Sequence, residues 1–142
     1  MVNRQRMRGE KRTYECATDS WSSERIELIT ECEPFQEGGM RYAFKARELD
    51  PDGSEMECVL KCFKADVVGE DEDVSQLIEA EAMTQMVAED YAQQFNRLAA
   101  SKGMSQHTIA FVPVSVVRVQ NEEDGTEETY SIEPYGCATE FA

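Results

Sequence analysis

Two glycines and two cationic side chains are the residues of this chain best suited to chemistry. Gly38 and Gly39 form a turn between two strand-like segments, Arg41 follows them, and Lys61 stands alone among the apolar residues of Val59–Phe63. Backbone N–H groups can approach a phosphate closely at glycines because no Cβ intervenes. Guanidinium and ammonium groups supply the matching positive charge. The pattern therefore indicates a site for a phosphate-bearing ligand.

Each of these residues also has an ordinary structural explanation. A glycine pair occurs in many hairpins, an arginine beside a turn can face solvent, and a strand lysine can lay its stem along the sheet to reach water. On a regular strand Val59, Lys61 and Phe63 point to one face. The two apolar side chains could then form a floor past which the lysine reaches a phosphate. The combination, rather than any one residue, favours the phosphate site.

Three strands in the first half of the chain must position these groups. Residues 24–32, 40–49 and 55–63 each show the alternation of apolar and polar residues that is typical of a strand. The segment 50–54 between the last two combines proline, aspartate and glycine, which suit a tight turn. Short connections of this kind predict a three-stranded antiparallel meander.

A long helix and two more strands are predicted in the second half. Apolar residues recur at helical spacing over residues 66–101, and strands are expected over 109–119 and 127–134. The helix carries Glu79 and Glu81, which could orient the strand lysine or belong to a solvated acidic face. The predicted fold class is α+β: a five-stranded antiparallel sheet in the order βββ-α-ββ, with one long helix packed on it.

The charge of the chain restricts its partners. A net charge of −15 over 142 residues argues against nucleic acid and against anionic membranes as ligands. Residues 1–22 are nevertheless predicted to be a flexible segment with a basic beginning, either a disordered tail or a docking signal. The basic residues at its start are Arg4, Arg6, Arg8, Lys11 and Arg12.

The cysteines are predicted to be free thiols. There are five of them and none forms a CxxC pair, which indicates a reducing compartment, with the cytoplasm as the default. The lone histidine, His107, lies far along the chain from the closest cysteines, so no metal site is predicted.

Several motifs together resemble a known family. Phe35–Phe44 and Val59–Phe63 are similar to the N-terminal lobe of the alpha-kinases, a family of atypical protein serine/threonine kinases. Further matches are Thr84–Ala88, Phe111–Val114 and Ile132–Tyr135. The resemblance covers about residues 25–135, in the order of the family. It implies a kinase N-lobe-like domain over residues 23–142.

The resemblance implies that this lobe binds ATP, with Mg²⁺ expected from the family. The lysine would contact the phosphates, the glycine turn with its arginine would form the phosphate-side loop, and a segment after the last strand would be the hinge that meets adenine. The residues implied at the ATP site are Gly38, Gly39, Arg41, Val59, Lys61, Glu133 and Tyr135.

The chain also departs from the family. Ala88–Glu89 stands where the family commonly has Ala-Lys, and the sequence after Tyr135 differs from the usual glycine- and aromatic-containing segment. The C-terminal lobe, with the metal-binding and catalytic acids, is expected to be missing. The first hypothesis is therefore an ATP-binding lobe of a protein serine/threonine kinase that, when complete, transfers the γ-phosphate of ATP to a protein hydroxyl.

Two alternatives remain beside it. One is a non-catalytic alpha-kinase-like fragment that acts as a binding or regulatory module, with a protein partner at the exposed face of the lobe. The other is an unrelated acidic α+β interaction domain in which the glycine pair is only a turn. The most informative measurement is nucleotide binding by the unchanged chain compared with Lys61→Ala, since equal affinities would remove Lys61 from the phosphate site.

Overall fold

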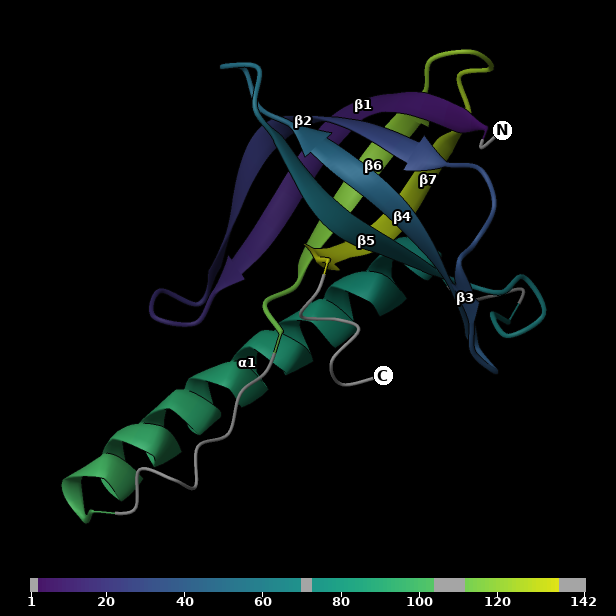
Figure 1. Cartoon of the computed structure of the whole chain (residues 1–142). Helices are drawn as coiled ribbons and strands as arrows, with labels where there is room; N and C mark the ends of the chain where they lie inside the picture. Colours follow the sequence, from purple (N-terminus) through teal and green to yellow (C-terminus); the bar gives the residue numbers. More distant parts are fainter. Residues whose placement is uncertain (1–2, 70–72, 104–111, 136–142) are drawn as a thin grey trace.

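Six antiparallel strands of the computed structural model close into a barrel, and one long helix lies across the outside of it (Figure 1). The structure describes residues 3–69, 73–103 and 112–135. The elements are β1 (Arg4–Glu15), β2 (Ser20–Glu31), β3 (Gln36–Glu37), β4 (Arg41–Leu49), β5 (Glu55–Phe63), α1 (Val74–Ser101), β6 (Ser115–Asn121) and β7 (Glu127–Pro134).

The order of the strands explains the closure. The sheet runs β2-β1-β6-β7-β5-β4-β3, and an additional pairing of β2 with β4 joins its two sides. In that pairing Thr30 lies opposite Ala46 and Glu27 lies opposite Leu49. The short β3 pairs only with β4 and stays outside the closed ring.

The alternation of side chains along the strands fills the interior of the barrel. Every second residue of a strand points inward, and the inward residues form one apolar cluster. It consists of Met7, Ile26, Leu28, Ala46, Cys58, Leu60, Val117, Val119, Tyr130 and Ile132, with Phe44 and Cys62 packed against it. The residues between them on β4 and β5, among them Arg41 and Lys61, therefore face outward.

Helix α1 has recognisable start and stop signals. The Asp73 side chain accepts hydrogen bonds from the backbone N–H groups of Ser75 and Gln76, which satisfies two of the free donors at the helix start. Lys102 caps the other end, and Gly103 follows at φ 75°, a conformation that glycine adopts easily. No helix within the described ranges is both long and apolar enough to cross a membrane.

Only the first half of α1 is packed on the barrel. Ile78 and Ala82 are buried against Val114 and Val116, in a second apolar cluster that also includes Phe63. Glu79 adds two ion pairs to the barrel wall, 2.5 Å to Arg12 and 3.0 Å to Arg118. The second half extends beyond the barrel (Figure 1). The side chains of Tyr91, Phe95 and Leu98 on this half are exposed.

The fold confirms the α+β class, but the prediction of a five-stranded sheet is wrong. The strands predicted over 40–49, 55–63 and 127–134 are present, and the first predicted strand begins earlier, at Ser20. The expected strand over 109–119 is shorter, since β6 begins at Ser115, while residues 104–111 lie outside the described ranges.

The largest correction concerns residues 1–22, which were expected to be flexible. Residues 4–15 instead form β1, which pairs with β2 on one side and β6 on the other. Its outward positions carry Arg4, Arg6, Arg8 and Arg12, while Lys11 lies on the inward side of the strand, in an ion pair with Glu48. At Gly9 the backbone lies so close to β6 that a Cβ would stand 1.8 Å from the Arg118 carbonyl oxygen. A strand that contributes few apolar side chains and one close backbone contact gives little signal to an apolar pattern.

Candidate functional site

The glycine turn is a tight hairpin between β3 and β4. The N–H of Gly38 donates to the Arg41 carbonyl, and the N–H of Phe35 donates to the Ala43 carbonyl, both at 2.9 Å. Neither glycine has a positive φ, and a Cβ at Gly39 would meet nothing within 4 Å. The hairpin itself therefore does not require glycine at this position. What glycine provides is open space above the backbone, where a ligand could approach.

Lys61 lies beside this turn on the outer face of β5. Its neighbours on the same face are Ala43 of β4 and Ser131 of β7. Its Nζ is 2.5 Å from Oε1 of Glu133, whose side chain is almost fully buried, at 8% exposure. The oxygen lies at ion-pair distance without the angles of a hydrogen bond, so the interaction is coulombic. The lysine compensates a carboxylate that would otherwise be buried alone.

Arg41 lies on the same face and pairs with the helix. Its Nη1 is 3.6 Å from Oε2 of Glu81, and both side chains are about half exposed. Of the two helix carboxylates considered as partners for Lys61, Glu81 thus contacts Arg41, and Glu79 contacts Arg12 and Arg118. Neither forms an ion pair with Lys61.

These groups line one groove, which we call the glycine groove. It has a volume of about 480 Å³ and is bounded by Gln36, the segment 38–43, Lys61, Phe63 and Glu81. Four residues predicted from the sequence therefore meet in one place: both glycines, Arg41 and Lys61. Two cations and an open backbone at one groove are suited to binding an anion such as a phosphate.

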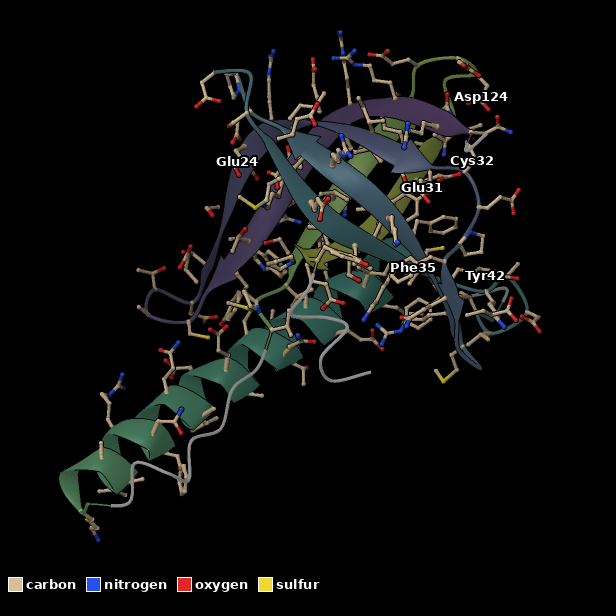
Figure 2. All side chains as sticks on the ribbon, viewed as in Figure 1. Glu24, Glu31, Cys32, Phe35, Tyr42 and Asp124 are labelled. Atoms are coloured by element: carbon tan, nitrogen blue, oxygen red, sulfur yellow. The ribbon has the colours of Figure 1, made fainter. Side chains whose placement is uncertain are left out.

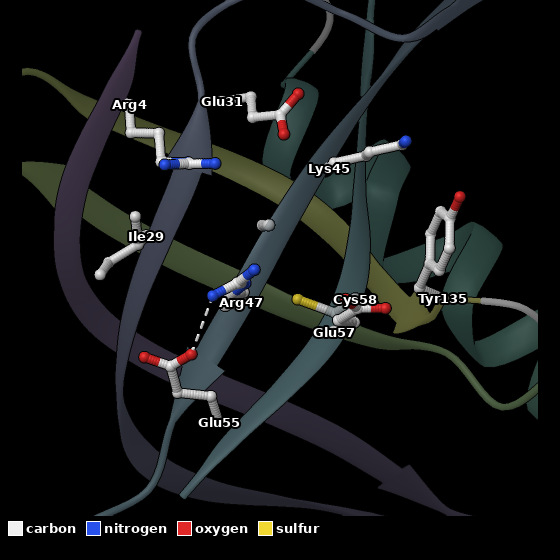
Figure 3. A pocket seen from close by; sticks show the side chains of 10 residues that line it. Arg4, Ile29, Glu31, Lys45, Arg47, Glu55, Glu57, Cys58 and Tyr135 are labelled. Carbon is white, nitrogen blue, oxygen red and sulfur yellow. Dashed lines mark hydrogen bonds and ion pairs between the residues drawn. The ribbon is translucent and has the colours of Figure 1, made fainter. Parts of the chain in front are cut away.

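The other predicted site residues lie at one end of this face. Val59 is completely buried and lies between Lys45 of β4 and Glu133 of β7 in the strand register. Tyr135 lines a separate cleft of about 320 Å³, the outer cleft, shared with Lys45 and Arg47 (Figure 3). Of the seven predicted site residues, four therefore line the glycine groove and Tyr135 lines the neighbouring cleft. Glu133 contacts the groove through its ion pair with Lys61.

Sequence reasoning missed one contact at the border between the two cavities. The Nζ of Lys45 lies 5.4 Å from the centre of the Phe35 ring and 5.4 Å from that of Tyr135. The rings meet edge to face, with centres 6.2 Å apart. Figure 2 shows Phe35 beside the short β3 strand. Both aromatics stood in the family motifs, but nothing local indicated that one lysine would contact both.

Metal ligands and thiols add little to this site. Within the described ranges no three acidic, histidine or cysteine side chains converge in a way that could bind a metal ion, so those residues do not by themselves offer a Mg²⁺ site. Cys16, Cys32, Cys58 and Cys62 are free thiols. Burial, aided by the Glu48 carboxylate, raises the pKa of Cys58 to about 12, which makes it a poor nucleophile.

The comparison with protein families matches most of the chain. Residues 36–142 fit the sequence model of the Alpha-kinase family. This chain belongs to the alpha-kinase family. The match begins at β3 and includes every residue that lines the glycine groove.

Solved alpha-kinase domains share the fold. The alpha-kinase domain of myosin-II heavy chain kinase A with a phosphorylated aspartate is 20% identical at a TM-score of 0.71, over 92% of this chain and 61% of that one. The same domain in complex with AMP is 19% identical at 0.70, over 93% and 62%. Its complex with AMP-PNP is 19% identical at 0.72, over 92% and 60%. The chain thus spans about three fifths of these alpha-kinase domains, and no curated protein matches it.

Proposed function

We propose that this chain is the ATP-binding lobe of an alpha-type protein serine/threonine kinase. The observation that carries the proposal is the convergence of the glycine turn, Arg41 and Lys61 on one groove. Membership of the alpha-kinase family supports it. So do the fold neighbours, which were solved with AMP, ATP and AMP-PNP.

The described residues suggest how a nucleotide is held. Lys61 has a carboxylate partner in Glu133, and Arg41 has one in Glu81. Phosphate oxygens carry more charge than one carboxylate, so they can take over the Arg41 contact, which is the more exposed and the longer of the two. Lys61 stays tied to Glu133, and the pair fixes where its ammonium lies when a phosphate arrives. Val59 is completely buried beside Glu133 in the strand register, so it can support this face from within but has no exposed surface for the base.

Phosphoryl transfer to a protein hydroxyl is proposed for the complete domain. In such reactions the protein mainly positions the phosphates and neutralises the charge that develops on them. Lys61 and Arg41 supply positive charge on one wall. Mg²⁺, expected from the family, would add positive charge at the phosphates, and the described residues form no site that would hold it. The described residues contribute the recognition half of this chemistry.

A binding measurement tests the proposal. ATP affinity is measured by calorimetry for the wild type and for Lys61→Ala, with Lys11→Ala as the matched control. Lys11 is also a strand lysine in an ion pair, with Glu48, and has a similar exposure. We expect Lys61→Ala to weaken ATP binding about tenfold or more, equivalent to roughly 1.4 kcal/mol, and Lys11→Ala to leave it unchanged.

Folding must be controlled, because Lys61→Ala leaves Glu133 as a buried charge without a partner. The double variant Lys61→Met with Glu133→Gln replaces both charges with neutral groups of similar shape. If this variant unfolds like the wild type and still binds ATP as tightly, Lys61 does not belong to the phosphate site. If the wild type binds no nucleotide at all, the proposed function is wrong for this chain.

A further inference from the structure

Lys45 contacts two segments that are far apart in the sequence. It projects from the outer face of β4, between Phe35 in the connection that leads to the glycine turn and Tyr135 at the end of β7. Each ring has its own anchor in the barrel, because the N–H of Phe35 donates to Ala43 and the N–H of Tyr135 donates to Glu57. The ammonium therefore bridges two rings that are already attached to β4 and β5.

Lys45 contacts aromatic rings although the protein is rich in carboxylates that could pair with it. Glu31 and Glu57 line the same outer cleft, as Figure 3 shows. Yet among the ion pairs of the described residues none involves Lys45, while its neighbour Arg47 pairs with Glu55 at 3.1 Å. A cation near the face of an aromatic ring is attracted by the ring quadrupole. Two rings at equal distance give Lys45 a defined position although its side chain is exposed.

The place of this contact in the register connects it to the nucleotide groove. Lys45, Val59 and Glu133 lie in one row across β4, β5 and β7, and Lys61 lies in the next row with Ala43 and Ser131. Phe35 is close in sequence to the glycine turn, and Tyr135 is close to Glu133. The two ends of the proposed ATP site are thus the two segments that Lys45 brings together.

We propose that Lys45 is a positioning residue that fixes the glycine turn against the segment after β7, through simultaneous contact with Phe35 and Tyr135. We call this contact the lysine clamp. The proposal rests on the proposed function in so far as it concerns ATP. Lys45 itself does not touch the phosphates, since it lines the outer cleft and not the glycine groove. Its effect is to hold the pocket in the shape that nucleotides need before they bind.

A comparison of adenosine with ATP separates positioning from direct contact. Affinities for both ligands are measured for the wild type, Lys45→Met and Lys45→Arg, with Arg47→Met as a control that removes a cation from the same face of β4. Loss of the clamp should lower the affinities for adenosine and for ATP by the same factor, about fivefold. Lys45→Arg keeps the cation and should stay within about twofold of the wild type, and Arg47→Met should have no effect.

Two outcomes of that comparison overturn the proposal. If Lys45→Met lowers the affinity for ATP and leaves the affinity for adenosine unchanged, then Lys45 is a phosphate ligand and not a positioning residue. If neither ligand is affected, the contact has no role in the pocket. Lys45 is an exposed side chain, so these variants are expected to fold, which a thermal unfolding curve verifies.

A second readout does not depend on nucleotides. The Nζ of Lys45 lies over two rings, so ring currents should shift the NMR signals of the adjacent methylene protons upfield in the wild type. Phe35→Leu and Tyr135→Leu should each remove part of that shift. If the wild type bound neither adenosine nor ATP, the proposed function would fail, and the clamp would stand or fall on this shift alone. An unshifted signal in the wild type overturns the clamp whatever the nucleotide results are.

Discussion

Lys61 and Glu133 form an ion pair between strand positions that are diagonal, not opposite. In the register Lys61 faces Ser131, and Glu133 faces Val59, yet the lysine reaches across to place Nζ 2.5 Å from the carboxylate. One side chain is a quarter exposed and the other nearly buried. The lysine thus connects the glycine groove with the strand end where Tyr135 follows.

The two partners of this pair are expected to respond unequally to substitution. Lys61→Ala leaves a buried carboxylate uncompensated and should lower the unfolding free energy by about 1–3 kcal/mol, less than for a fully buried pair because water reaches the lysine. Glu133→Gln keeps the shape and leaves a lysine that can turn to solvent, so its cost should be below about 1 kcal/mol. Urea denaturation of both variants measures the difference. Equal losses would show that burial of Glu133 is not what the lysine compensates.

Glu81 is expected to compete with the nucleotide for Arg41. Its carboxylate is 3.6 Å from the guanidinium, so a phosphate that binds Arg41 must displace it. Glu81→Gln should therefore tighten ATP binding, by about twofold to threefold for an exposed pair, and the gain should shrink at high salt. Glu123→Gln, an exposed glutamate in the β6–β7 turn, is the control. Weaker binding by Glu81→Gln would mean that Glu81 helps to hold Arg41 in place.

Gly39→Ala should separate folding from binding. A Cβ at this position meets nothing within 4 Å, so the unfolding free energy should change by less than about 0.5 kcal/mol. A phosphate that approaches the backbone would meet the new methyl group, and ATP affinity should fall about tenfold, roughly 1.4 kcal/mol. Calorimetry and urea denaturation give the two numbers. Unchanged ATP binding would place the phosphates away from the turn.

Gly9→Ala should have the opposite profile. Its Cβ would lie 1.8 Å from the Arg118 carbonyl oxygen and 2.8 Å from the Val119 Cα, both of them backbone atoms. β1 and β6 would have to separate locally, and we expect a loss of about 3 kcal/mol or more in unfolding free energy. Gly39→Ala serves as the comparison. A fully stable Gly9→Ala protein would contradict the close approach of the two strands.

Cys58 should make the protein sensitive to alkali. Its pKa is raised from 9.0 to about 12, mainly by burial, so the unfolded chain loses this proton at lower pH than the folded one. The stabilising contribution is therefore complete below pH 9 and is lost as the pH rises through about 12. Cys58→Ala should flatten the fall of unfolding free energy between roughly pH 9 and 11, while Cys32→Ala, at an exposed thiol, should not. Identical slopes would contradict the raised pKa.

The sequence predicted those parts of the fold whose signal is local. β4, β5 and β7 alternate clearly, so their positions were predictable to within a few residues. The end of α1 at Ser101, with a glycine shortly after it, was predicted as well, but the helix begins at Val74, eight residues after the expected start at residue 66. β1 has mostly charged outward residues and depends on Gly9 for its contact with β6. The pairing of β2 with β4 depends on a register between distant segments, and neither feature appears in an apolar pattern.

The same distinction applies to the site. Residue types and spacing predicted that both glycines, Arg41 and Lys61 would share one face, and they line one groove. The partners were not predictable in the same way. Lys61 pairs with Glu133 instead of a helix glutamate, and Lys45 meets two aromatic rings, because the closed barrel and not the helix decides which distant side chains come within reach.

The closure of the barrel also determines where this domain can be truncated without exposing strand edges. Similarity to the family begins at residue 36, which invites a domain boundary there, but β1 and β2 lie before it and seal the gap between β6 and β4. A protein shortened to that boundary would present two open strand edges, each with a row of unpaired N–H and C=O groups. Such edges pair with strands of other molecules. By covering these edges, β1 and β2 thus protect the lobe that carries the groove against aggregation.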